Sequence, residues 1–195
     1  LGDVYKRQKE GDSVMIQRPV YHPFTNVVKE NGRKLVNNPL VMENGKYHMD
    51  YEDMERKITE EQVKLFLLCS PHNPVGRVWT ADEIRRTAQI AHQAGVLFVC
   101  DEIHGEFVFG GNRYLPAAQV EGVDPLRTVI LTSPTKTFNL AGAGIAAIIA
   151  ADPKVRAKID RAVNDNECCD VNVFGVAADI AAWNQGEEWL EALLS

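Results

Sequence analysis

Apolar residues along the chain gather in short runs rich in β-branched side chains, and stretches with helical periodicity separate these runs. A strand buried on both faces of a parallel sheet forms such a continuous apolar run, because helices cover both faces. Six runs fit this description, at residues 13–17, 34–36, 63–69, 96–101, 128–132 and 144–150. The pattern predicts an α/β fold with a mostly parallel sheet flanked by helices.

Several helix boundaries can be placed between these runs. The sequence TADE, beginning at Thr80, is a capping box in which the Thr80 hydroxyl and the Glu83 carboxylate each accept a hydrogen bond from a first-turn amide. This helix should end at Gly95, which can adopt the left-handed conformation. Another helix is expected to start at Pro153. The C-terminal stretch is expected to form two helices broken near Gly186.

Composition narrows the class of protein. The chain has 195 residues, of which 45% are hydrophobic, so it is long and apolar enough for one domain with a core. A formal net charge of -6 gives no reason to expect nucleic acid or an anionic membrane as a partner. Without a spanning segment or a secretory signal pattern, the cytoplasm is the expected location. The four cysteines lack metal-ligand spacing, so no metal site is expected.

Polar residues directly follow four of the predicted strands. Ligands of open parallel sheets bind at the carboxyl ends of the strands, so these positions are candidates for a site. The four segments are RPVYHPF, SPHNPVG, DEIH and TSPTKTF. Taken singly, each has an ordinary explanation. Asp101 could cap a turn, Lys136 could be a solvated surface lysine, Asn73 could begin a turn, and Tyr21 could be a core aromatic residue.

Together these residues provide what pyridoxal 5'-phosphate (PLP) requires. The aldehyde of PLP needs an amine, such as that of Lys136. Its pyridine nitrogen needs an acidic partner, such as Asp101, that keeps the nitrogen protonated so that the ring can accept electrons. An amide donor and a flat aromatic surface complete the set, and Asn73 and Tyr21 supply them.

Three longer segments carry a family resemblance. SPHNPVGRVWT, VCDEIHGEFVF and SPTKTFNLAG closely resemble fold-type I, aspartate-aminotransferase-like PLP enzymes of class I/II. Within that family they look most like the cystathionine β-lyase branch, the C–S lyases. The resemblance covers residues 9–195 and implies the large, PLP-binding domain of that fold. It implies cleavage of cystathionine or cysteine S-conjugates to a thiol, pyruvate and ammonia.

The resemblance also implies residue roles. Lys136 would hold PLP covalently and then remove the substrate α-proton, while Asp101 would bind the pyridine N–H. Asn73 would donate to the ring 3-oxygen, and Tyr21 would stack on the ring. Ser133 would hydrogen-bond the phosphate.

Two further positions are assigned in the same way. Thr135 would assist Ser133 at the phosphate, and His104 stands where many aminotransferases of this fold carry a tyrosine near the 3-oxygen. That difference favours a lyase over the first alternative, a class I/II aminotransferase. A second alternative is a non-catalytic effector-sensing module, which nothing in these residues supports. The resemblance further implies cis peptide bonds before Pro19 and Pro74.

Family members are about twice as long as this chain, and they act as homodimers on small amino-acid substrates. Their phosphate-cradling loop would precede Lys9, and their small domain with its carboxylate-binding arginine would follow Ser195. We therefore expect an incomplete large domain that is inactive by itself. Its strand at residues 144–150 should form a bare sheet edge. Residues 1–8, LGDVYKRQ, resemble an in-frame translation of a sequencing-library adapter and are assigned no function.

Overall fold

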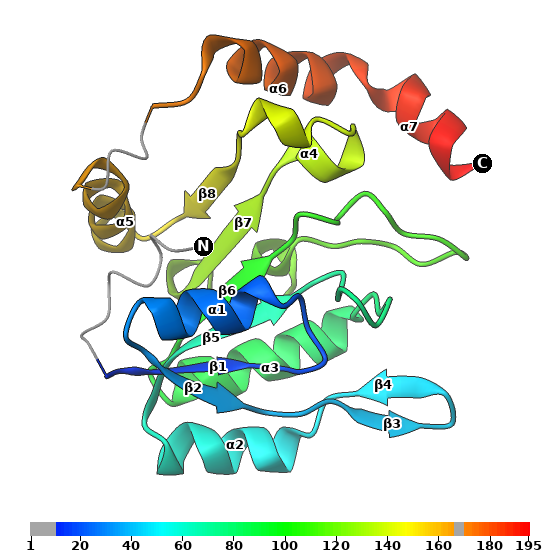
Figure 1. The fold of residues 1–195 in the computed structure, drawn as a ribbon. Helices are drawn as coiled ribbons and strands as arrows, with labels where there is room; N and C mark the ends of the chain where they lie inside the picture. Colours follow the sequence, from blue (N-terminus) through cyan, green and yellow to red (C-terminus); the bar gives the residue numbers. More distant parts are fainter. Residues whose placement is uncertain (1–10, 166–169) are drawn as a thin grey trace.

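A twisted sheet of six strands runs through the molecule in the order β2-β1-β5-β6-β7-β8 (Figure 1). The computed structural model describes residues 11–165 and 170–195, so the adapter assignment of residues 1–8 lies outside the described residues. The strands are β1 (Ser13–Ile16), β2 (Lys34–Asn37), β5 (Val63–Cys69), β6 (Leu97–Asp101), β7 (Thr128–Thr132) and β8 (Ala147–Ala150). Only β8 pairs antiparallel within this sheet, to β7. The predicted mostly parallel sheet is confirmed.

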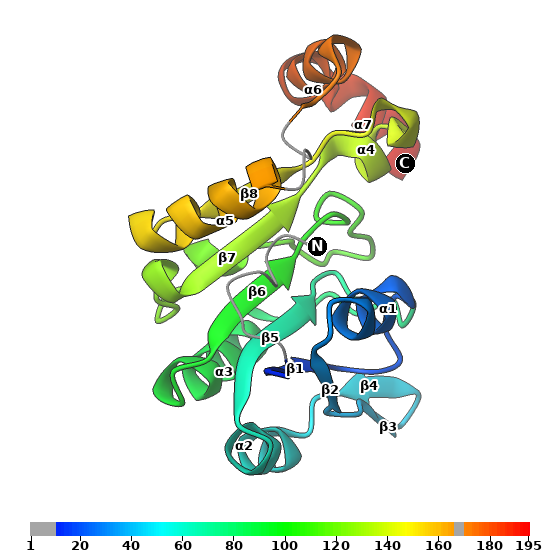
Figure 2. The ribbon, with the colours of Figure 1, turned by 60° about the vertical axis from the view of Figure 1, so that its left-hand side comes forward.

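The helices lie on both faces of the sheet and at its end (Figure 2). They are α1 (Pro23–Glu30), α2 (Tyr51–Glu60), α3 (Ala81–Gln93), α4 (Pro134–Thr137), α5 (Pro153–Asp165), α6 (Val173–Gln185) and α7 (Glu187–Leu194). Three short 3-10 helices span Ala117–Gln119, Pro125–Arg127 and Ala141–Ala143. Helices α6 and α7 meet at Gly186, as predicted, and α5 begins at Pro153.

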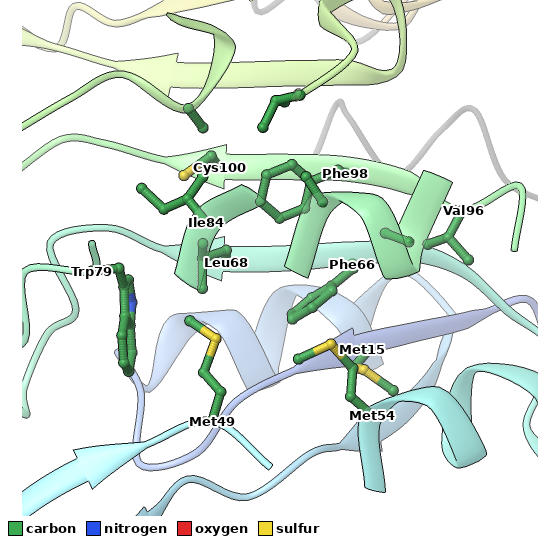
Figure 3. Packing of buried hydrophobic residues seen from close by; sticks show 14 of the residues in the cluster. Met15, Met49, Met54, Phe66, Leu68, Trp79, Ile84, Val96, Phe98 and Cys100 are labelled. Carbon is green, nitrogen blue, oxygen red and sulfur yellow. The ribbon is translucent and has the colours of Figure 1, made fainter. Parts of the chain in front are cut away.

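Alternate residues along the central strands face two separate cores, because side chains of a strand point to opposite faces. On β6, Phe98 and Cys100 belong to the core under α2 and α3, whereas Leu97 and Val99 belong to the core under α1 and α5. The Phe98 ring meets the Phe66 ring edge-on, with centroids 6.0 Å apart (Figure 3). A hydrophobic core therefore packs against each face of the central strands, and this packing holds the carboxyl ends of the strands in place.

Two details of the strands differ from the sequence expectation. Strand β8 starts only at Ala147, because a 3-10 turn ending at the left-handed Gly144 occupies the preceding residues. A separate antiparallel hairpin, β3 (Val41–Glu43) with β4 (Lys46–His48), was not predicted. Its turn is formed by Asn44 and Gly45, both with positive φ, and an Asn-Gly pair between short strands is a known hairpin signal.

Strand β8 forms an edge of the sheet in the described part of the chain, as predicted. Its residue Ile149 is 54% exposed. Further exposed apolar side chains lie on α6 and α7, among them Phe174 and Trp183. More than half of the exposed large apolar side chains in the described ranges thus lie on β8, α6 and α7.

Thr80 caps α3 as the sequence predicts. Its hydroxyl accepts from the Glu83 N–H at 3.2 Å, and the Glu83 carboxylate accepts from the Thr80 N–H at 2.8 Å. Replacing Thr80 with alanine should lower the free energy of unfolding by about 1 kcal/mol. The Glu83 N–H loses its acceptor, and the Glu83 carboxylate is no longer held in line with the N–H of residue 80. Urea denaturation measures this loss of stability. Thr59→Ala, on the exposed face of α2, is the control and should cost less than about 0.5 kcal/mol.

Candidate active site

The strongest candidate site is a cavity of about 440 Å³ at the carboxyl ends of the parallel strands. The arrowheads of β5, β6 and β7 point toward this end of the sheet, where α4 lies (Figure 1). Five predicted site residues line the cavity together, namely Tyr21, Asn73, Asp101, His104 and Lys136. Four chain segments that are far apart in sequence therefore converge as the strand-end argument predicts.

Asp101 is the last residue of β6 and is only 8% exposed. Its Oδ1 accepts from the Ile103 N–H at 3.2 Å, and the carboxylate forms no ion pair with any side chain in the described ranges. Burial raises the pKa of this carboxyl above its ordinary value. A buried carboxylate that lines a cavity, with no ion pair to a described side chain, is suited to bind a protonated ring nitrogen.

Lys136 extends from α4, a single helical turn whose other side chains hold it against the protein. Pro134, Thr135 and Thr137 are buried, whereas Lys136 is exposed at the cavity. The Lys136 ammonium has no hydrogen-bond or ion-pair partner among the residues that the structure describes. The backbone of Lys136 is therefore held in place by the buried turn, while its amine is left available to a ligand in the cavity.

Ser133 and Thr135 are brought near the site but do not line the cavity. The Ser133 Oγ lies 2.6 Å from the Ile145 carbonyl oxygen, to which it can donate, and accepts from the Thr135 N–H at 3.1 Å. Ser133 is thereby the N-cap of α4. Both hydroxyls are buried and 2.8 Å apart. In this arrangement they hold the turn that carries Lys136.

His104 is half-buried between the main cavity and a second, shallower hollow of about 260 Å³. Burial lowers the pKa of its imidazole, and the nearby charge of Lys136 lowers it further. The neutral ring can donate from one nitrogen and accept at the other. It is thus able to contact a polar ligand atom beside Lys136.

Tyr21 and Asn73 come from the loops after β1 and β5. The Tyr21 ring is 44% exposed and stands edge-on to Phe24, with centroids 6.2 Å apart. The Asn73 N–H donates to the Cys69 Sγ at 3.5 Å. The peptide bonds before Pro19 and Pro74 are cis, as the resemblance implies, and the Ser70–Pro71 bond is cis as well.

Cys69, in the cavity wall, and Glu102, next to Asp101, were not among the predicted site residues. Cys69 forms part of the cavity wall, and burial raises the pKa of its thiol to about 12. Glu102 is 1% exposed and accepts from the Ala117 N–H at 2.7 Å and from the Tyr114 hydroxyl. Glu102 thus fixes the loop that follows Asp101. In the sequence, Glu102 stands out only as a second carboxylate directly after Asp101. Its residue type alone does not tell whether the side chain binds a ligand or holds a loop in place.

The described ranges hold no cluster of three or more residues able to bind a metal ion. In the same ranges, no helix is long and apolar enough to cross a bilayer. The cavity's combination of amine, buried carboxylate, amide and aromatic ring fits an aromatic aldehyde with a protonated ring nitrogen, such as PLP.

Comparison with characterised proteins gives consistent relatives. The chain is 38% identical over 185 residues to cystathionine beta-lyase PatB of Bacillus subtilis, covering 95% of this chain and 48% of PatB. It is 32% identical over 184 residues to protein MalY of Escherichia coli, covering 94% of this chain and 46% of MalY. The chain therefore spans about half the length of the curated relatives it matches.

Solved structures agree with these sequence matches. Cystalysin from Treponema denticola, which contains a pyridoxal 5'-phosphate cofactor, superposes with a TM-score of 0.93 at 30% identity, over 98% of this chain and 48% of cystalysin. The PLP-bound C–S lyase from Staphylococcus hominis gives a TM-score of 0.90 at 30% identity, over 98% and 49%. The sequence also matches the family described as aminotransferase class I and II over residues 3–182. With motif, cavity and fold in agreement, the chain belongs to the class I and II aminotransferase family.

Proposed function

We propose that this chain provides the cofactor-binding part of a PLP-dependent C–S β-lyase. The lyase cleaves cystathionine or a cysteine S-conjugate to a thiol, pyruvate and ammonia. The observation that carries the proposal is the convergence of Lys136, Asp101 and Asn73 on one cavity. Similarity to PatB and to the S. hominis C–S lyase supports this reaction.

When bound, PLP supplies an electron sink for the charge left at the substrate α-carbon. Lys136 holds the cofactor through its amine. Its amine, when not bonded to the cofactor, would be placed to take the proton from the substrate α-carbon. The absence of a competing ion pair at Lys136 among the described residues supports both roles. The β-thiolate then departs from the substrate with the bonding electrons.

The remaining residues bind and orient the cofactor. Asp101 accepts the ring N–H, and its burial strengthens that charge-assisted hydrogen bond. With the cofactor bound, Asn73 would donate to the 3-oxygen, His104 would contact the same region, and Tyr21 would stack on the ring. For the Ser133 and Thr135 hydroxyls, the phosphate contact that the family resemblance implies remains a proposal. Their present hydrogen bonds additionally support a role in positioning Lys136.

The proposal also covers the substrate, the location and the oligomeric state of the enzyme. Its substrate is a small amino acid, it works in the cytoplasm, and the full-length enzyme is a homodimer. The family match also favours a second candidate, amino-group transfer to a keto acid, because transamination shares the steps up to α-proton removal. The two reactions separate when the carbanion either expels a β-substituent or is reprotonated.

Product analysis distinguishes these two reactions. The assay uses the full-length enzyme loaded with PLP. We expect it to release pyruvate from cystathionine at least about tenfold faster than it exchanges amino groups with keto acids. Pyruvate is measured by a coupled dehydrogenase assay, and exchange by isotope transfer from labelled alanine. Exchange at the higher rate would replace the lyase assignment with an aminotransferase.

A further inference from the structure

His72 is a buried histidine between two loops that carry site residues. It is 1% exposed, and its Nε2 lies 2.9 Å from the carbonyl oxygen of Pro19. Pro19 is two residues before Tyr21, and His72 is directly before Asn73. One side-chain hydrogen bond thus joins the loop after β1 to the loop after β5.

The direction of this hydrogen bond follows from the chemistry of its partners. The Pro19 carbonyl can only accept, so the His72 Nε2 carries the proton and donates. Burial lowers the pKa of His72 to about 4, which keeps the ring neutral near pH 7. Its other nitrogen, Nδ1, is buried without a hydrogen-bond partner among the described residues. Among the described residues, the contact with ordinary hydrogen-bond geometry is therefore the one to the Tyr21 loop, and weaker interactions with the Gln17 and Cys69 backbones add to it.

The His72 ring is itself held from the opposite side. It stands edge-on to the Trp79 indole, with centroids 5.5 Å apart and an interplanar angle of 88°. Trp79 in turn donates from its Nε1 to the Cys69 carbonyl oxygen at 3.0 Å. Since Cys69 ends β5, the Pro19 carbonyl is tied through His72 and Trp79 to a central strand of the sheet.

From this arrangement we infer that His72 is a positioning residue that sets the separation of Tyr21 and Asn73 across the cavity. This inference rests on the proposed function, because it assigns Tyr21 to a face of a bound PLP ring and Asn73 to the 3-oxygen of that ring. His72 itself does not line the main cavity. Loss of its donor would let the Tyr21 loop move away from the ring.

Two substitutions separate the hydrogen bond from the packing. His72→Phe keeps a ring against Trp79 but removes the donor, whereas His72→Gln keeps an N–H donor of similar reach. In the purified chain we expect His72→Phe to raise the Kd for PLP about tenfold, the size of effect that one lost hydrogen bond produces. His72→Gln should restore the Kd to within about threefold of the wild-type value.

A second readout requires no cofactor. Amide hydrogen exchange of residues 20–25 in cofactor-free protein should be about tenfold faster in His72→Phe and near the wild-type rate in His72→Gln. The matched control is His92→Phe, because His92 is also buried and stands edge-on to an aromatic ring, that of Phe98, at 6.3 Å. His92→Phe should change neither readout.

The outcomes decide the two proposals separately. If wild-type protein fails to bind PLP, the proposed function is wrong, and the exchange measurement still decides the role of His72. Unchanged exchange in His72→Phe, or no restoration by His72→Gln, contradicts the positioning role. An equal effect of His92→Phe contradicts it as well, since that result would point to general destabilisation.

Discussion

Lys136→Ala should abolish covalent binding of PLP and raise the Kd for PLP by at least about 100-fold. The reason is that only an amine at this place can bond the aldehyde, and Lys136 lines the cavity from the short, buried turn α4. Absorbance titration measures the Kd. Borohydride reduction followed by mass spectrometry of peptides identifies the modified residue.

Two controls make the Lys136 result specific. Lys136→Arg retains the positive charge but lacks an amine that can form the bond, so it should lose the covalent adduct as completely as alanine does. Lys154→Ala removes an exposed lysine at the start of α5 and should leave PLP binding unchanged. An adduct that persists in Lys136→Ala on a different lysine would show that the cofactor is held elsewhere.

Asp101→Asn should have opposite effects on stability and on cofactor binding. The Asp101 carboxylate is buried and its pKa is raised, so its ionised form lowers the stability of cofactor-free protein at neutral pH. The amide keeps an oxygen that can accept from the Ile103 N–H but carries no charge. We expect the free energy of unfolding to rise by about 1 kcal/mol while the affinity for PLP falls at least about tenfold.

The pH dependence gives a second test of Asp101. A carboxyl whose pKa is raised in the folded state destabilises that state above its folded pKa, and the penalty disappears once both states are protonated. The stability gain of Asp101→Asn should therefore grow as the pH rises above the ordinary value of 3.8 and vanish well below it. Chemical denaturation across this range measures it. Asp82→Asn, an exposed carboxylate with 85% side-chain exposure, should show no comparable gain.

The sequence was sufficient to predict that four side chains of the site lie together. Tyr21, Asn73, Asp101 and Lys136 each follow an apolar run, and parallel strands place such positions at one end of the sheet. The same reasoning placed the α3 cap at Thr80, because a capping box depends only on residues close in sequence.

What the sequence could not supply is the direction of individual side chains. Ser133 and Thr135 stand near Lys136 in sequence, yet their hydroxyls bond to each other and to the backbone around α4. The His72 contact joins residues 53 positions apart and leaves no local pattern. Sequence periodicity reports which face is buried, but hydrogen-bond partners across loops depend on the folded backbone.

Residues from the loops after β1, β5, β6 and β7 line the cavity, so the cavity forms only when the whole sheet has folded. No single segment of the chain contains the site, so a ligand that needs all four loops binds the native state and not partly folded chains. By mass action, such a ligand at 100 times its Kd adds about 2.7 kcal/mol to the free energy of unfolding. Cellular supply of the cofactor would then regulate how much of this polypeptide survives proteolysis, independently of any reaction that it catalyses.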